Sequence, residues 1–191
     1  MKFEQFWGVL MDHITKSYFE DLESEDKNLQ YEAFQNIIHA TNDSVDWAYE
    51  VWDQLLEWLT DSDHHRRARA GQFLSALAIS DPEKRMLQDF PALWEVTKDS
   101  KFVTVRHTLQ SIWKVGLAGQ EQREMVLSYI IDRFNNGIDE KNYTLIRYDL
   151  IVGLRKLYDE VKDEQIKEIA MELIEYEEDS KYKKKYMSAW R

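Results

Sequence analysis

The sequence predicts an all-α protein built from consecutive helical hairpins that stack side by side. Aspartates recur at roughly 35 to 40 residues, which is the spacing of helix-hairpin repeats. They are Asp26, Asp61, Asp99, Asp139 and Asp179. Only two prolines and six glycines occur in 191 residues, which disfavours a fold of many strands and tight turns. Apolar residues also recur at three- and four-residue intervals, as they do on one face of a helix.

The first hairpin is expected from a helix over residues 3–18 and a partner over residues 27–40, joined by an acidic linker. The apolar stripe of the first helix consists of Phe3, Phe6, Trp7, Leu10 and Ile14. That of the partner consists of Tyr31, Phe34, Ile37 and Ile38. Both stripes follow the i, i+3, i+4, i+7 pattern, so we expect these side chains to face the core.

The second hairpin follows residues 41–44, which are rich in N-capping residue types. The stripe of its first helix consists of Val45, Ala48, Trp52, Leu55, Leu56 and Leu59. Trp47, Val51 and Trp58 lie about 100° around the same helix, and so wide an apolar arc predicts neighbours on two sides. We therefore interpret the three tryptophans as core residues rather than an aromatic binding patch. The partner helix is expected at residues 63–79.

The third hairpin contains both prolines of the chain. Pro82 follows Asp81 and is expected at the first helical position. Pro91 predicts a kink or a split in the same helix, because proline removes one backbone hydrogen bond. The partner helix is expected at residues 102–117, ending near Gly119.

The fourth and fifth hairpins complete the series. Asn135, Asn136 and Gly137 are expected to stop a helix whose stripe ends at Phe134, and residues 143–157 form the return helix. The fifth pair places Ile166, Ile169, Ala170 and Leu173 on one stripe. A short last helix carries Tyr182, Tyr186 and Trp190. A polar terminal unit of this kind would cap the stack against solvent.

An aspartate turn followed by an arginine and an apolar stripe is repeated three times. The copies begin at Asp61-Ser62 with Arg67, at Asp99-Ser100 with Arg106, and at Asp139 with Arg147. This pattern resembles the HEAT and armadillo group of helical repeat proteins over about residues 43–158. The resemblance implies a right-handed α-α superhelix (an α-solenoid) of about five HEAT-like hairpins, in a single domain over residues 1–191. It also implies that the repeat arginines pair with turn aspartates of the same or a neighbouring repeat.

Charge is divided unequally between the two helices of each hairpin. The second helices, taken as 27–42, 62–80, 100–118, 140–158 and 180–191, hold sixteen Lys or Arg and four acids, a net of +12. The whole chain carries −11, so the remainder carries −23. The negative total opposes generic binding to polyanions. The resemblance places the second helices on the concave surface, where a negatively charged partner region would be attracted.

The candidate contact residues are seven basic side chains of the second helices, chosen after the three repeat arginines and the C-terminal lysines are set aside. They are Arg66, Arg69, Lys101, His107, Lys114, Arg155 and Lys156. This set would suit phosphates or an acidic protein surface.

The sequence gives no sign of a catalytic or cofactor site. There is no phosphate-binding glycine motif, no Gly-x-Ser-x-Gly and no cysteine, and we expect neither catalytic residues nor a cofactor. Asp61, Asp63, His64 and His65 are the closest approach to a metal site. Adjacent histidines diverge by about 100° on a helix and zinc pairs usually lie four residues apart, so we interpret this cluster as a helix start without a metal.

The predicted function is a non-enzymatic protein–protein interaction module or scaffold. Charges interrupt the N-terminal apolar residues too early for a secretion signal, and no apolar run approaches the ~20 residues of a membrane span. We therefore expect a cytoplasmic protein without membrane contact. Its partner is expected to be a protein rather than a nucleic acid. The acidic outer face would suit an inhibitor or immunity-type protein that neutralises a basic partner.

One alternative function stays open. Residues 43–47, Asp-Ser-Val-Asp-Trp, followed by Arg66 and Arg67 loosely resemble the DNA alkylation-repair glycosylases, which are also built from HEAT-like repeats. That resemblance implies nucleic-acid binding on a cationic concave face with tryptophan, aspartate and arginine near the extruded base. Salt-dependent binding to duplex DNA would separate it from the interaction module.

Overall fold

The computed structural model describes residues 11–191, which form ten α-helices, three short 3-10 helices and no β-strand. The prediction of an all-α chain is confirmed. The α-helices are α1 (His13–Asp21), α2 (Lys27–Ala40), α3 (Ala48–Trp58), α4 (His64–Leu77), α5 (Arg85–Glu95), α6 (Phe102–Leu109), α7 (Gln120–Asn136), α8 (Tyr143–Val161), α9 (Glu164–Tyr176) and α10 (Ser180–Ser188). The 3-10 helices are η1 (Ala78–Ser80), η2 (Val96–Lys98) and η3 (Ile112–Leu117). Within residues 11–191, no helix combines the length and apolar character that a bilayer crossing requires.

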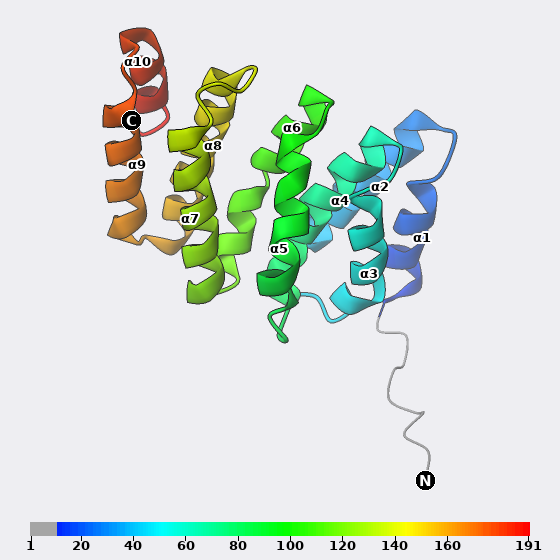
Figure 1. Ribbon diagram of the computed structural model, residues 1–191. Coiled ribbons are helices and arrows are strands. Elements are labelled where there is room, and N and C mark those ends of the chain that lie inside the picture. Colours follow the sequence, from blue (N-terminus) through cyan, green and yellow to red (C-terminus); the bar gives the residue numbers. More distant parts are fainter. Residues whose placement is uncertain (1–10) are drawn as a thin grey trace.

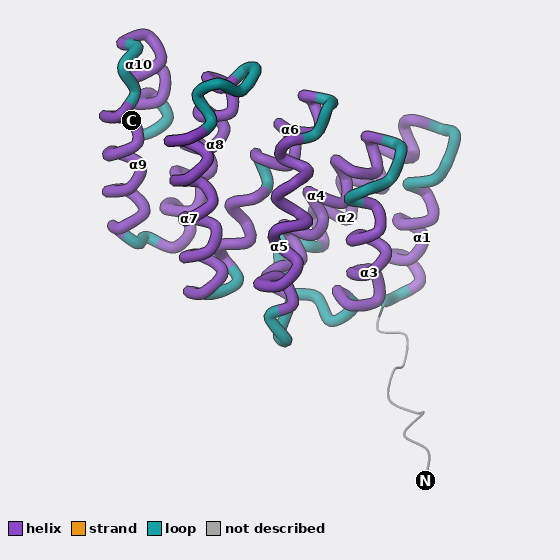
Figure 2. The backbone as a smooth tube through the Cα atoms, in the orientation of Figure 1, coloured by secondary structure: helices purple, strands orange, loops and turns teal. Residues whose placement is uncertain are grey.

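The helices are arranged in two layers. The even-numbered helices contact one another in chain order, α2 with α4, α4 with α6, α6 with α8, and α8 with α10. On the odd-numbered side α3 contacts α5, α5 contacts α7, and α7 contacts α9. Figure 1 shows the consecutive pairs side by side in a row, with α1 and α10 at opposite ends, and Figure 2 shows short loops between most of them. We call the two sides the even layer and the odd layer.

The recurring aspartates lie in the turns that precede the even-numbered helices. Asp26 and Asp179 are N-caps of α2 and α10 and accept hydrogen bonds from backbone N–H groups of the first turn. Asp61 accepts from the backbone N–H of Asp63, which in turn caps α4. Asp99 likewise accepts from a backbone N–H two residues on, at 2.7 Å. At Asp26 and Asp179 the carboxylate satisfies donors that the helix itself leaves unpaired, and at Asp61 and Asp99 it binds the residue that immediately precedes the helix.

The expectation of a helix over residues 3–18 is confirmed for residues 13–18, but its start and its apolar stripe are wrong where the structure can test them. Helix α1 begins at His13, and Ile14, which was expected in the apolar stripe, is 65 % exposed. The rest of that stripe, Phe3, Phe6, Trp7 and Leu10, lies outside the described residues. Asp12 caps α1 through the backbone N–H of Thr15, and this cap fixes the start of the helix.

Pro82 is not the first residue of a helix. Helix α5 begins at Arg85, and Pro82 lies in a turn that ends at Lys84 in the left-handed conformation, with φ of 56°. The carboxylate of Asp81 accepts from the backbone N–H groups of Arg85 and Met86 at 3.0 and 2.7 Å. Asp81 thus satisfies two of the free N–H donors at the start of α5 from the other end of this turn. Pro82 therefore lies before the helix.

The expected split of the third hairpin lies in its second helix rather than at Pro91. Helix α5 continues through Pro91, whereas the partner divides into α6, which ends at Leu109, and η3, which begins at Ile112. The hydroxyls of Thr108 and Ser111 donate to carbonyls four residues back, each at 3.0 Å. Such bonds bend helices, and the β-branched residues of this segment have low helix propensity.

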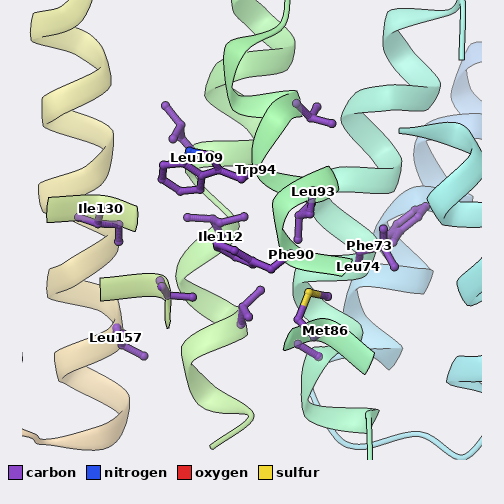
Figure 3. Close-up of a cluster of buried hydrophobic side chains, with 14 of the residues drawn as sticks. Phe73, Leu74, Met86, Phe90, Leu93, Trp94, Leu109, Ile112, Ile130 and Leu157 are labelled. Atoms are coloured by element: carbon purple, nitrogen blue, oxygen red, sulfur yellow. The ribbon is translucent and has the colours of Figure 1, made fainter. Parts of the chain in front are cut away.

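The core is continuous from Met11 to Tyr186. Figure 3 shows its middle part, where Phe73 of α4, Phe90 of α5 and Ile130 of α7 point into the space between the layers. Trp47 and Trp52 are buried and Trp58 packs partly against the core, so the interpretation of these tryptophans as core residues is confirmed.

Candidate partner-binding face

Two hollows open on the even layer. The first, about 360 Å³, lies between α2, α4 and α6, and we call it the Arg69 groove. Its residues are Lys27, Gln30, Tyr31, Phe34, His65, Ala68, Arg69, Gln72 and His107. The second, about 270 Å³, lies near η3, and we call it the Lys114 hollow. Its residues are Thr41, Asn42, Ala76, Ile79, Trp113, Lys114, Leu117 and Glu160. The Arg69 groove contains no acidic residue although the whole chain has 36.

The repeat arginine Arg67 is structural. Its guanidinium holds both carboxylate oxygens of Asp99, at 2.5 and 3.0 Å, and donates to the carbonyls of Asp61 and Ser62. Arg67 therefore joins α4 to the turn of the next hairpin. The expected pairing with a turn aspartate is confirmed here. Burial favours a higher pKa for Asp99, but the bonds from Arg67 and from the Lys101 backbone outweigh it, and the pKa of Asp99 is lowered.

The other two repeat arginines pair with acids that are not the periodic turn aspartates. Arg106 binds Asp149 on α8 at 2.7 and 2.8 Å, not the turn residue Asp139. Arg147 binds Glu177 at 2.8 Å, with both side chains 4 % exposed, and donates twice to the carbonyl of Phe134. The aspartate expected for Arg147 is engaged as the cap of α10. All three arginines still link one hairpin to the next, and we call these contacts the arginine ladder.

Arg66 and Arg69 behave differently although both were candidates on α4. Arg66 forms ion pairs with Glu23 and with Asp61, and lies 5.8 Å from the centre of the Trp58 ring. Arg69 has neutral partners, the carbonyl of Leu22 at 3.1 Å and the amide oxygen of Gln30 at 2.8 Å. Burial lowers the pKa of Arg69, because it disfavours the charged form.

His107 on α6 and Lys101 at the start of α6 are both exposed. His107 lines the Arg69 groove, so the structure brings it together with Arg69. Lys101 immediately precedes α6 and lines neither hollow.

The remaining candidates lie around the Lys114 hollow. Lys114 lines it, and burial followed by the nearby charge of Lys156 lowers the pKa of Lys114. The ammonium of Lys156 lies 6.0 Å from the ring centre of Trp113, which also lines the hollow. Arg155 instead forms an ion pair with Asp159 at 2.8 Å. Thus Lys114 and Lys156 form a pair of neighbouring cations at this hollow, whereas Arg155 is neutralised by Asp159.

Sequence reasoning missed Lys27, Gln30, Tyr31 and His65 as groove residues. Tyr31 was expected in the core but is 67 % exposed, because the groove leaves it without a covering helix. A usable signal was present: Lys27 with Tyr31, and His65 with Arg69, are i, i+4 pairs that share a helix face. What the sequence could not show is that these two faces lie opposite each other.

Two further expectations concern metals and DNA. Among residues 11–191, no group of three or more His, Asp or Glu is placed to hold a metal ion. In the stretch that resembles DNA glycosylases, Trp47 is buried against Phe19 and Arg67 is bound to Asp99. Neither side chain is available to a nucleotide.

No protein-family model matches the chain, and the comparison with curated proteins finds no match either.

Proposed function

We propose that the chain is a non-enzymatic protein-interaction module, a HEAT-like α-solenoid that binds an acidic region of a partner protein on its even layer. The observation that carries this proposal is the acid-free Arg69 groove, which Lys27 and Arg69 line, in a chain of net charge −11. The Lys114 hollow adds Lys114, with Lys156 close by, although Glu160 also lines it. The ordered contacts within each layer and the arginine ladder support the solenoid part of the proposal.

The charge distribution favours a local acidic region over a long polyanion. The negative net charge repels nucleic acid at a distance, while the hollows attract carboxylates nearby. The cations at the two hollows are also separated from each other, and their neighbours Arg66 and Arg155 are neutralised by carboxylates. Tyr31, Phe34 and Trp113 add apolar surface beside the charges, a combination typical of protein contacts.

The test is quantitative affinity capture from the native host with two charge-matched variants. Lys114→Glu combined with Lys156→Glu reverses the cations of the Lys114 hollow. Lys98→Glu combined with Lys167→Glu changes the net charge equally, but both lysines are exposed outside the hollows and pair only with nearby glutamates. We expect the parent to capture a stoichiometric protein partner and the first variant to capture at least about tenfold less of it. The control variant should capture as much as the parent.

Circular dichroism is used to check that both variants keep the helicity of the parent. Equal loss of the partner in both variants would reduce the effect to net charge and overturn the proposal. Retention of every partner by the Lys114→Glu/Lys156→Glu variant would overturn it as well. Binding of duplex DNA at low salt that weakens steeply with added salt would instead favour a nucleic-acid function.

A further inference from the structure

Arg69 is an arginine without a carboxylate. Within residues 11–191, every arginine except Arg69 and the C-terminal Arg191 forms an ion pair with an Asp or Glu. The carbonyl of Leu22 and the amide of Gln30 accept two of the five N–H groups of Arg69. The other three have no acceptor among the described residues, and Arg69 lines the groove.

The nearest acidic side chains do not bind the remaining N–H groups of Arg69. Asp63 and Glu23 act on Arg69 only at a distance, because Asp63 caps α4 and Glu23 is paired with Arg66. A partly buried cation without a counter-ion keeps the cost of its lost hydration. A carboxylate that entered the groove would form charge-assisted hydrogen bonds with Arg69, and these would offset the cost of its lost hydration.

The partners of Arg69 hold it in place. The side-chain amide nitrogen of Gln30 donates to the carbonyl of Ser24, and this bond orients the amide oxygen toward Arg69. The carbonyl of Leu22, a residue that is 1 % exposed, fixes the second contact. Arg69 is therefore oriented before any ligand arrives, which lowers the entropy lost on binding.

The walls of the groove define the rest of the ligand. Lys27, His65 and His107 add further donors or positive charge around Arg69. Burial, and then the neighbouring His64, lower the pKa of His65, and Arg69 and Lys27 act in the same direction. Tyr31, with most of its ring exposed, and Phe34 supply an apolar wall. The volume of about 360 Å³ is within the usual range of small-ligand sites and fits one or two side chains.

We propose that the Arg69 groove is a carboxylate-recognition subsite that binds a glutamate or aspartate side chain, next to an aromatic or aliphatic residue, in a linear segment of a partner protein. Arg69 binds the carboxylate and Tyr31 and Phe34 contact the apolar neighbour. This proposal rests on the proposed function, since it assigns the partner's contact on the even layer.

The experiment uses the full chain and two blocked dipeptides, acetyl-Phe-Glu-amide and acetyl-Phe-Gln-amide. Binding is followed by NMR through the ring Cε1–H signals of His65 and His107, assigned with single-histidine variants. We expect the Glu peptide to shift both signals and to bind at least about tenfold more tightly than the Gln peptide. Arg69→Gln should remove that preference, whereas Arg155→Gln, on a cation already paired with Asp159, should preserve it.

Equal binding of the two peptides, or an unchanged preference in Arg69→Gln, would overturn the subsite. Inorganic phosphate is titrated in parallel. If it shifts the same signals at lower concentration than the Glu peptide, the groove is a site for free anions and the peptide proposal is wrong. Partner loss in the Lys114→Glu/Lys156→Glu variant without peptide binding would overturn only the subsite. Peptide binding without such a loss would support the subsite and overturn the wider interface.

Discussion

Arg67 and Arg69 lie two residues apart on α4, yet they belong to two different regions of the molecule. Arg67 is part of the arginine ladder, with its donors engaged by Asp99 and two carbonyls. Arg69 points about 200° away around the helix and lines a groove without acids. Basic residues on one helix therefore divide into those that join hairpins and those that remain available, and the partner of each side chain decides which.

The ladder and the groove also differ in what they contribute. A ladder arginine removed from its buried acid leaves an uncompensated charge, so its loss affects folding. A groove arginine has no such acid, so its loss affects binding and leaves stability nearly unchanged. Three predictions test this contrast, from the largest effect to the smallest.

Arg147→Ala is expected to destabilise the fold by about 3–5 kcal/mol, because it leaves the buried carboxylate of Glu177 and the carbonyl of Phe134 without their donor. Urea unfolding followed by circular dichroism measures the free energy. The matched control is Arg155→Ala on the same helix, whose exposed ion pair with Asp159 should contribute little. Equal destabilisation in the two variants would contradict a special role for the ladder.

Arg67→Gln and Arg69→Gln give the closest comparison. We expect Arg67→Gln to cost about 1.5–3 kcal/mol, because the side chain of Asp99, only 5 % exposed, loses its charged donor. Arg69→Gln should change the free energy of unfolding by less than about 1 kcal/mol, because no carboxylate loses a partner. Thermal and urea unfolding of both variants provide the measurement. A larger loss in Arg69→Gln would place Arg69 among the structural arginines.

The ladder should also show a characteristic pH dependence. The pKa of Asp99 is lowered from 3.8 in the folded protein, so its contribution to stability is complete above that value and is lost as the pH falls below it. The stability difference between the parent and Arg67→Gln should therefore be largest above about pH 4 and shrink below it. Urea midpoints between pH 5 and 2.5 measure it. The core variant Leu154→Ala serves as control, and its difference should stay constant over the same range.

Local signals predicted much of the chain correctly. The bounds of α2 agree with the expected 27–40, and α7 ends at Asn136, immediately before Gly137. Capping and periodicity act within a few residues, so they can be recognised in a sequence. The predicted position of Pro82 was wrong because Asp81 accepts from Arg85 and Met86 across a turn that ends at Lys84, so the helix begins three residues later than Pro82.

Long-range choices were predicted less well. The acids of Arg106 and Arg147 lie 43 and 30 residues ahead, and they were not the periodic aspartates. Tyr31 follows the core pattern of α2 but is exposed in the groove that α2, α4 and α6 line together. That groove is formed by the packing of three helices from different hairpins. Among the seven candidate contact residues, the sequence could not distinguish Arg69 from Arg66, since both follow the same turn.

The sequence by itself determined the helices, their order and the concentration of positive charge on every second one, because periodicity, capping and composition operate over a single turn or hairpin. Only the tertiary structure decided which of these charges meet an acid. An ion pair forms between atoms a few ångströms apart, and that separation is set by how neighbouring hairpins pack rather than by their spacing along the chain.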